Sequence, residues 1–129
     1  MSTTPMISIV DDDGSVRRAL KGLIRSLGYD AVTFGSAEEY LDFDRLQDTS
    51  CLITDVQMPG MSGIELQQRL IEGGHSTKVI FITGFPEERL RTRALEAGAV
   101  GFLKKPCDET CLIECLGKAL EATGTSAEC

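Results

Sequence analysis

The stretch ISIVDDDGSV, residues 7–16, leads four apolar or small residues directly into three consecutive aspartates. So short a run of apolar and β-branched residues predicts a buried strand. The three carboxylates that follow repel one another, so we expect positive charge close to them in the fold. The question raised by this stretch is which task each aspartate performs.

Four further segments have the same strand character, and two of them end in a polar side chain. Residues 50–55 end in Asp55, and KVIFIT, residues 78–83, ends in Thr83. Such short apolar runs are typical of strands that are buried on both faces of a parallel sheet. The expected strands are therefore 6–11, 30–34, 50–55, 78–83 and 99–103.

Helical signals fill the segments between the first strands. Apolar residues recur at helical spacing over about 14–27, which predicts an amphipathic helix there. Two Ser-x-x-Glu capping boxes, Ser36–Glu39 and Ser62–Glu65, predict two further helices, because the hydroxyl and the carboxylate each pair with a backbone N–H group of the first turn.

The second half of the chain contains two more helices. One is expected over about 86–97, with Pro86 in its first turn, where the missing N–H group has no partner to lose. Asp108 opens the last one. Five strands that alternate with five helices predict an α/β domain, a doubly wound five-stranded parallel sheet flanked by five helices.

Composition narrows the class of protein. The 129 residues are 42% apolar and 26% charged, which is typical of one globular domain, expected over 1–121 with 122–129 as a C-terminal tail or the start of a linker. A net charge of -7 argues against direct nucleic-acid binding by this domain. The sequence has no membrane-spanning run and no export signal, so we expect a cytoplasmic location with no membrane contact.

Side chains suited to phosphoryl transfer collect where the strands end. In an open parallel sheet, ligands bind beyond the carboxyl ends of the strands. Carboxylates supply oxygen ligands for Mg²⁺ and a nucleophile, while a hydroxyl and an ammonium neutralise the transferring group. The residues expected at this edge are Asp11, Asp12, Asp13, Asp55, Thr83, Gly84, Lys104, Lys105 and Pro106.

Four motifs along the whole chain resemble one known family, the receiver domains of bacterial two-component response regulators. Among them, the chain is most similar to receivers of nitrogen-fixation and LuxR-type regulators. The resemblance implies a flavodoxin-like sheet with strand order 2-1-3-4-5. The motifs are IVDD at 9–12, TDVQMPGMSGIEL at 54–66, FITG at 81–84 and ALEAGAVGFLKKP at 94–106.

The resemblance implies a role for each residue of the acidic site. Asp55 matches the phospho-acceptor of the family. Asp11 and Asp12 match its acidic pair, so Asp12 would bind Mg²⁺ directly and Asp11 through water. Asp55 and the backbone carbonyl of Gln57 would complete the ligands that the protein supplies.

The resemblance also implies the residues that hold the phosphoryl group and pass on the signal. Thr83 and Gly84 would contact the phosphoryl group, and Lys105 would pair with it across a cis peptide bond to Pro106. Phe102 matches the rotating aromatic residue of the switch.

The family also implies partners. The phosphoryl donor would be a sensor histidine kinase, and phosphorylation would favour a homodimer or act on a C-terminal DNA-binding output domain outside this chain. The surface expected to change comprises the fourth helix, the fifth strand and the fifth helix. The domain would be a signalling switch that catalyses only its own phosphorylation and dephosphorylation, and not a metabolic enzyme.

Two other functions stay open. Asp11, Asp13, Gly14 and Ser15 are spaced as in a magnesium-dependent phosphohydrolase that attacks with an aspartate. That class also needs acidic residues that the chain does not offer in a suitable place, so we expect Asp13 only to start the first helix. The other alternative is a receiver-shaped module that binds partners without phosphorylation.

Several conspicuous side chains have simpler interpretations. Three cysteines at steps of four are expected to act as small apolar residues along the last helix. The single histidine is expected in a solvated loop, and a basic side of the first helix is expected to face solvent. These residues are Cys107, Cys111 and Cys115; His75; and Arg17, Arg18, Lys21 and Arg25.

Overall fold

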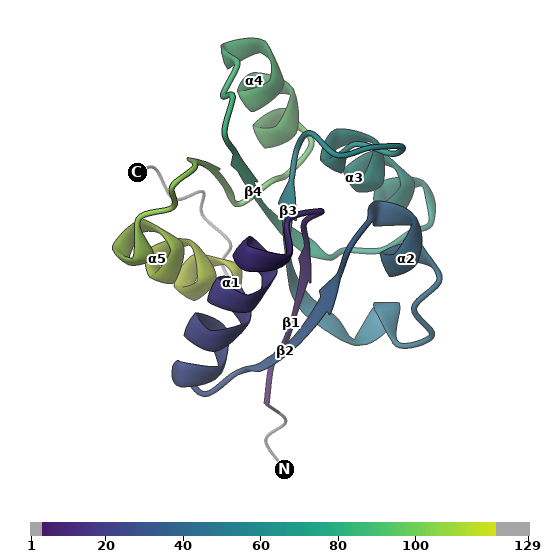
Figure 1. Ribbon diagram of the computed structural model, residues 1–129. Coiled ribbons are helices and arrows are strands. Elements are labelled where there is room, and N and C mark those ends of the chain that lie inside the picture. Colours follow the sequence, from purple (N-terminus) through teal and green to yellow (C-terminus); the bar gives the residue numbers. More distant parts are fainter. Residues whose placement is uncertain (1–3, 121–129) are drawn as a thin grey trace.

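The computed structural model describes residues 4–120, in which five strands and five α-helices alternate along the chain (Figure 1). The predicted tail, 122–129, lies outside the described residues. A short 3-10 helix, Leu46–Asp48, precedes the third strand. The elements are β1 Met6–Val10, α1 Gly14–Ser26, β2 Asp30–Phe34, α2 Ala37–Leu41, β3 Thr49–Asp55, α3 Gly63–Glu72, β4 Lys78–Thr83, α4 Glu88–Glu96, β5 Gly101–Lys104 and α5 Glu109–Leu120.

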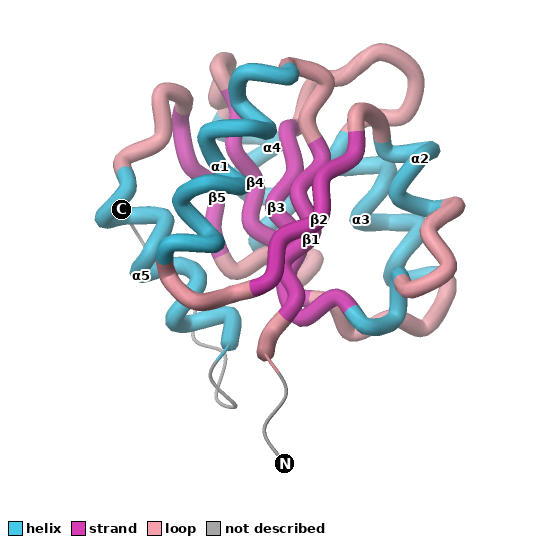
Figure 2. Tube along the Cα trace, turned by 60° about the horizontal axis from the view of Figure 1, so that its bottom comes forward, coloured by secondary structure: helices cyan, strands magenta, loops and turns pink. Residues whose placement is uncertain are grey.

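The five strands form one parallel sheet in the order β2-β1-β3-β4-β5, as predicted. Helices α1 and α5 pack on one face of the sheet, and α2 and α3 pack on the other (Figure 2). Helix α4 shares the core of α2 and α3. Two apolar cores result, one on each side of the sheet. No helix in the described part of the chain is long and apolar enough to span a membrane.

Strand register brings the expected site residues to one edge of the sheet. Thr54, next to Asp55, pairs with Val10 of β1, and Thr83 pairs with Lys104 of β5. The strands therefore end nearly level, so the loops after β1, β3, β4 and β5 meet beyond the same edge.

The N-terminal ends of α1 and α3 agree with the capping residues predicted from the sequence. Asp13 caps α1 by accepting a hydrogen bond from the Ser15 backbone N–H at 2.8 Å. Ser62 and Glu65 form the complete predicted capping box of α3. At α2 only half of the predicted box forms, because the Glu39 carboxylate accepts from the backbone N–H of Gly35 and not from that of Ser36.

The prediction for the start of α4 was wrong by about two residues. The helix begins at Glu88, after an extended Glu87 that makes no side-chain cap. Pro86 therefore lies before the helix and not in its first turn. Only Ala94 of this helix is fully buried, and its carbonyl accepts a buried hydrogen bond of 3.1 Å from the Gln67 side-chain amide of α3.

The fifth strand also begins later than predicted, at Gly101 in place of residue 99. The backbone N–H of Ala99 donates to the carbonyl of Ala94, so it closes the end of α4 and is not available to the sheet. The backbone N–H of Val100 donates to the Val79 carbonyl at 2.8 Å, one residue before the strand starts.

A glycine allows α3 to approach the end of β3. The backbone N–H of Gly63 donates to the Val56 carbonyl at 2.8 Å. A Cβ atom at position 63 would overlap the carbonyl oxygen of Asp55 and would lie 3.2 Å from a ring carbon of Phe81. The absence of a side chain thus sets the position of the loop that follows Asp55.

Candidate functional site

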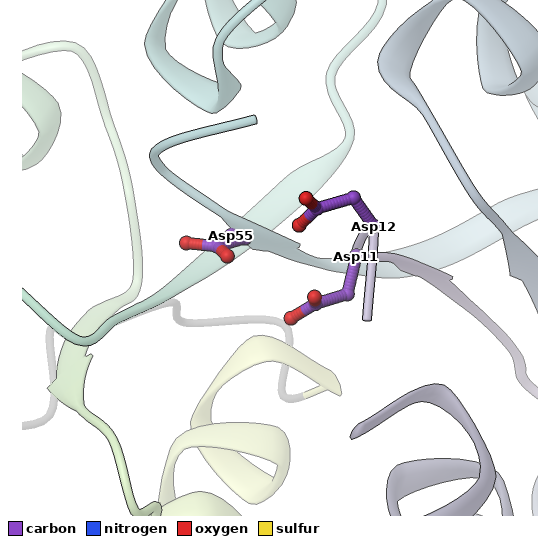
Figure 3. A group of neighbouring side chains, drawn as sticks. All are labelled: Asp11, Asp12 and Asp55. Carbon is purple, nitrogen blue, oxygen red and sulfur yellow. The ribbon is translucent and has the colours of Figure 1, made fainter. Parts of the chain in front are cut away.

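Three carboxylates meet beyond β1 and β3. Ligand oxygens of Asp11, Asp12 and Asp55 all lie within 4.8 Å of one another (Figure 3). Asp11 is 1% exposed and Asp55 is 7% exposed, whereas Asp12 is open to solvent. Within residues 4–120, this is the only group of three or more potential ligand side chains that could hold a metal ion.

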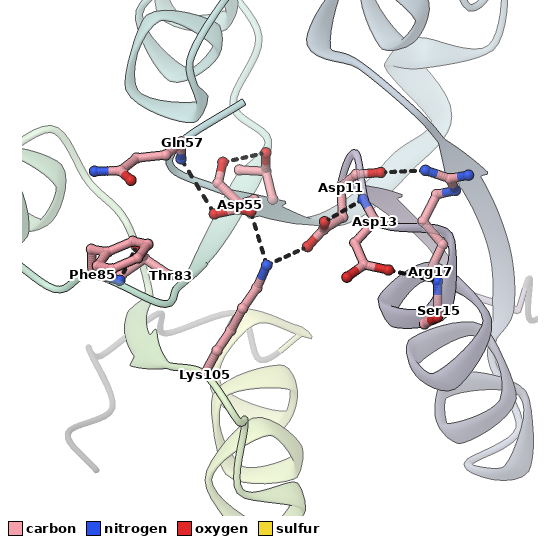
Figure 4. Close-up of polar contacts among 10 residues, drawn as sticks. Asp11, Asp13, Ser15, Arg17, Asp55, Gln57, Thr83, Phe85 and Lys105 are labelled. Atoms are coloured by element: carbon pink, nitrogen blue, oxygen red, sulfur yellow. Dashed lines mark hydrogen bonds and ion pairs between the residues drawn. The ribbon is translucent and has the colours of Figure 1, made fainter. Parts of the chain in front are cut away.

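Lys105 supplies the positive charge that the three aspartates require. Its Nζ lies 2.8 Å from Asp55 Oδ2 and 3.0 Å from Asp11 Oδ2 (Figure 4). The peptide bond from Lys105 to Pro106 is cis, as predicted. Lys104 is exposed, so it is not the lysine of the site.

Burial and neighbouring charges change the pKa values of two side chains in the site, Asp11 and Lys105. Burial raises the pKa of Asp11 above its ordinary value of 3.8, although the backbone N–H of Asp13 and the ammonium of Lys105 partly oppose this change. Burial alone would lower the pKa of Lys105, but hydrogen bonds and charges from Asp55 and Asp11 outweigh it and raise the pKa above 10.5. Lys105 is therefore a cation over the whole physiological range.

The end of β4 forms the other wall of the site. Asp55, Gln57, Thr83, Gly84, Phe85 and Lys105 line a pocket of about 190 Å³. The buried Thr83 hydroxyl accepts a hydrogen bond from the Phe85 backbone N–H at 3.1 Å, and the Gln57 N–H donates to Asp55 Oδ1 at 3.3 Å. The hydroxyl proton of Thr83 remains available for an acceptor in the pocket.

Phe102 lies apart from this pocket. It is partly buried against the core that contains Phe81, with ring centroids 6.0 Å apart. The structure therefore brings Asp11, Asp12, Asp55, Thr83 and Lys105 together, whereas Asp13 and Lys104 do not join them. Phe102 also lies apart, and its role as a rotating switch residue stays a prediction. The role of the Gln57 carbonyl as a metal ligand also stays a prediction.

Asp13 has a purely local task. Its carboxylate caps α1, and it is not a member of the three-carboxylate group. This answers the question raised by the run of three aspartates: the first two belong to the acidic site, and the third starts a helix.

Two contacts that support the site were not predicted. Arg17 was expected to face solvent, but its Nη1 donates to the backbone carbonyl of Asp11 at 2.6 Å. Glu38 of α2 accepts a hydrogen bond from the Met61 N–H at 3.0 Å and so holds the loop after Asp55. A cation in the first turns of a helix was a possible signal for Arg17, because the helix dipole disfavours it there. Glu38 and Met61 are 23 residues apart, and the sequence carries no signal for that contact.

The cysteines and the histidine behave almost as expected. Cys115 is buried in the core beneath α5, and Cys107 and Cys111 pack against that core. Cys107 was predicted to lie along the last helix, which was wrong, because α5 begins only at Glu109. Burial is the main cause that raises the pKa of Cys107 to about 11, so its thiol is protonated at neutral pH. His75 lies in the loop after α3 and is partly buried, not fully solvated as predicted.

The chemistry of the donors fits a divalent cation such as Mg²⁺. The site holds three carboxylates and one ammonium, so acidic groups are in excess, and carboxylate oxygens are the ligands that Mg²⁺ prefers. Asp11 Oδ2 is buried, and among the described residues it accepts no well-aligned hydrogen bond, although it contacts Lys105. Asp11, Asp12 and Asp55 are therefore the residues that would hold the ion.

The raised pKa of Asp11 predicts that Asp11→Asn stabilises the metal-free protein. The folded state holds the Asp11 proton more tightly than the unfolded state does, so stability falls as pH rises above 3.8 and through the raised pKa. We expect Asp11→Asn to increase the free energy of unfolding at pH 7 by about 1 kcal/mol. Thermal unfolding in EDTA measures this change.

The gain should shrink as pH is lowered and should vanish well below 3.8, where Asp11 is protonated in both the folded and the unfolded state. Asp44→Asn removes an exposed carboxylate and should leave the melting temperature unchanged. A lower melting temperature for Asp11→Asn would mean that the ion pair with Lys105 outweighs the burial of charge.

Comparison with known proteins agrees with this geometry. The family model of the response regulator receiver domain matches residues 7–117. Nodulation protein W of Bradyrhizobium diazoefficiens is 41% identical over 120 residues, which are 93% of this chain and 53% of that protein. The transcriptional regulatory protein FixJ of Azorhizobium caulinodans is 38% identical over 122 residues, 95% of this chain and 56% of that protein. The chain thus spans about half the length of these curated relatives.

Solved structures show the same likeness in three dimensions. The structure of FixJ-N has 34% sequence identity and a TM-score of 0.83, and the match covers 94% of this chain and 97% of that one. The response regulator StyR has 39% identity and a TM-score of 0.84, with 92% of this chain and 60% of that chain covered. The chain therefore belongs to the family of receiver domains of two-component response regulators.

Proposed function

We propose that Asp55 accepts a phosphoryl group from a sensor histidine kinase, with Mg²⁺ held by Asp11, Asp12, Asp55 and the carbonyl of Gln57. The observation that supports this most directly is the position of Lys105, whose ammonium contacts both Asp11 and Asp55 at the wall of the pocket that contains Thr83. The carboxylate of Asp55, an ammonium and a hydroxyl therefore line one small pocket, and the carboxylates of Asp11 and Asp12 lie beside Asp55.

The transfer itself follows from these groups. An oxygen of Asp55 attacks phosphorus, a P–O bond forms, and the P–N bond to the kinase histidine breaks, with the imidazole leaving. Lys105 and the Thr83 hydroxyl donate to the oxygens of the transferring group, and Gly84 exposes backbone beside them. The cation, when bound, neutralises charge that develops on those oxygens. In this proposal the domain catalyses only its own phosphorylation and dephosphorylation.

The groove between α1 and α5 is the proposed docking surface for the kinase. It has a volume of about 480 Å³ and opens beside Lys105. Its walls are apolar and include Val16, Leu20, Leu23, Cys107 and Leu112. An apolar side chain of the kinase that enters this groove would bring the phosphohistidine close to Asp55.

The output of the proposed switch is a change of surface. A phosphoryl group on Asp55 would draw the Lys105 ammonium and the Thr83 hydroxyl toward itself, and the change would reach Phe102 and the surface of α4, β5 and α5. We propose that this surface forms a homodimer or controls a DNA-binding domain that follows the receiver. The names of the relatives support this output, since FixJ is called a transcriptional regulatory protein.

The proposal includes the extent and setting of the domain. The receiver comprises residues 1–121, and 122–129 form a tail or linker. The domain is proposed to act in the cytoplasm, and its net charge of -7 disfavours direct binding to nucleic acid.

Intact mass spectrometry of the wild-type chain tests the proposal. Incubation with acetyl phosphate and Mg²⁺ should add the mass of one phosphoryl group, and EDTA should prevent the addition. Peptide fragmentation should place the group on Asp55. No adduct with acetyl phosphate, together with no binding of beryllofluoride, would leave a binding module that works without phosphorylation.

A further inference from the structure

We infer that Arg17 is a positioning residue for the metal site, because its guanidinium fixes the peptide unit that joins Asp11 to Asp12. This inference rests on the proposed function, in which those two residues bind Mg²⁺. The contact that supports it is the hydrogen bond from Arg17 Nη1 to the Asp11 carbonyl, at 2.6 Å (Figure 4).

Asp11 is held at each of its polar groups. Its backbone N–H donates to the Phe34 carbonyl at 3.1 Å, and its Oδ1 accepts from the Asp13 N–H at 2.9 Å. Its Oδ2 contacts Lys105, and its carbonyl accepts from Arg17. Arg17 is therefore the side chain that fixes the backbone carbonyl of Asp11, the one polar group of this residue that the other contacts do not hold.

The carbonyl of Asp11 has a direct geometric effect on Asp12. A peptide unit is planar, so the direction of the Asp11 carbonyl determines where the Asp12 nitrogen lies. Asp12 is exposed, and no described hydrogen bond orients its carboxylate. The direction in which the Asp12 side chain points from the backbone therefore depends on the contact between Arg17 and the Asp11 carbonyl.

The location of Arg17 in α1 is unfavourable without this contact. The helix begins at Gly14 and has no acidic residue in its first turn, so a cation there opposes the helix dipole. Arg17 is nevertheless drawn in toward the site and is partly buried. The space it occupies borders Gly35, where a Cβ atom would come within 3.5 Å of Arg17 Nη1.

Whether Mg²⁺ affinity rises or falls when the Arg17 side chain is replaced distinguishes a positioning role from a simple effect of its charge. Arg17 carries a positive charge near an acidic site, so removing it would strengthen cation binding if charge were its only contribution. Loss of a positioning contact weakens binding, typically by tenfold or more for a group that orients a ligand. The two effects have opposite directions.

The test is the dissociation constant for Mg²⁺, measured by isothermal titration calorimetry of the wild-type chain and Arg17→Met. We expect the variant to bind about tenfold more weakly. Methionine has nearly the helix propensity of arginine, and urea unfolding in EDTA checks that the variant is folded. Arg17→Lys keeps the charge without the planar guanidinium, so its affinity should lie between the two. It also serves if Arg17→Met fails to fold.

Arg18→Met is the matched control, because Arg18 is the exposed neighbour and carries the same charge. It should bind Mg²⁺ within about twofold of the wild type. Equal or tighter binding by Arg17→Met, or equal weakening by Arg18→Met, would overturn the inference. If the wild-type chain itself bound no Mg²⁺, the proposed function would fall, and that result is distinct from a failure of the inference alone.

Discussion

Asp55→Asn is expected to abolish the covalent phosphoryl adduct that acetyl phosphate and Mg²⁺ produce on the wild-type chain. The amide has no anionic oxygen to attack phosphorus, and its neutral side chain gives up the ion pair with Lys105. The amide carbonyl can still accept the hydrogen bond from the Gln57 N–H, so the loop should keep its shape. Intact mass measured under identical conditions should show no added phosphoryl group.

Asp13→Asn is the control for this experiment. Asn is as good a helix cap as Asp, so α1 should keep its start, and Asp13 lies outside the acidic group. We expect this variant to be phosphorylated to the same extent as the wild type. An adduct that persisted in Asp55→Asn and mapped to Asp11 would instead favour the hydrolase interpretation of Asp11, Asp13 and Ser15.

Gly63→Ala is expected to cause a large loss of stability, although it adds only one methyl group. The new Cβ atom would overlap the Asp55 carbonyl oxygen, a backbone atom that cannot rotate away. The start of α3 would then have to move off the end of β3, which would strain the Gly63 to Val56 hydrogen bond. We expect the free energy of unfolding to fall by about 3 kcal/mol, measured by urea denaturation.

Gly22→Ala provides the opposite expectation with the same chemical change. Gly22 is exposed within α1, and a Cβ atom there has no neighbour within 4 Å. Because alanine is a better helix former than glycine, stability should rise by about 1 kcal/mol. A small effect of Gly63→Ala would mean that the loop after Asp55 adjusts easily, so the glycine would not be what sets its position.

Much of the fold was predictable because the strands are short, apolar and buried. Such runs have one stable arrangement when helices alternate with them, and the carboxyl ends of the strands then lie at one edge. Asp11, Asp55, Thr83 and Lys105 could be assigned to a common site for this reason. The order of the strands and the cis bond before Pro106 required the resemblance to receiver domains.

The errors have a common physical origin in loops. Residue 86 was expected inside α4, but the backbone remains extended through Glu87. The first residues of the expected fifth strand close α4 instead, since Ala99 donates to Ala94. The contacts of Arg17 and Glu38 depend on how helices lie against loops, which the spacing of residues along the chain does not determine.

Helix α4 is held to the domain by fewer buried residues than the other helices, so it should move more easily than they do. Helices α3 and α5 bury five and four residues, whereas α4 buries one and begins without a side-chain cap. The free energy of local opening increases with the number of buried contacts. Helix α4 should therefore have the lowest free energy of detachment among the helices. It is the next element of the chain after β4, which ends at Thr83, so a displacement of Thr83 would act first on the helix that buries the fewest residues. The side chains of the acidic pocket are held by hydrogen bonds from several elements, so a shift of α4 would change the surface of the domain and leave the positions of Asp55 and Lys105 unchanged.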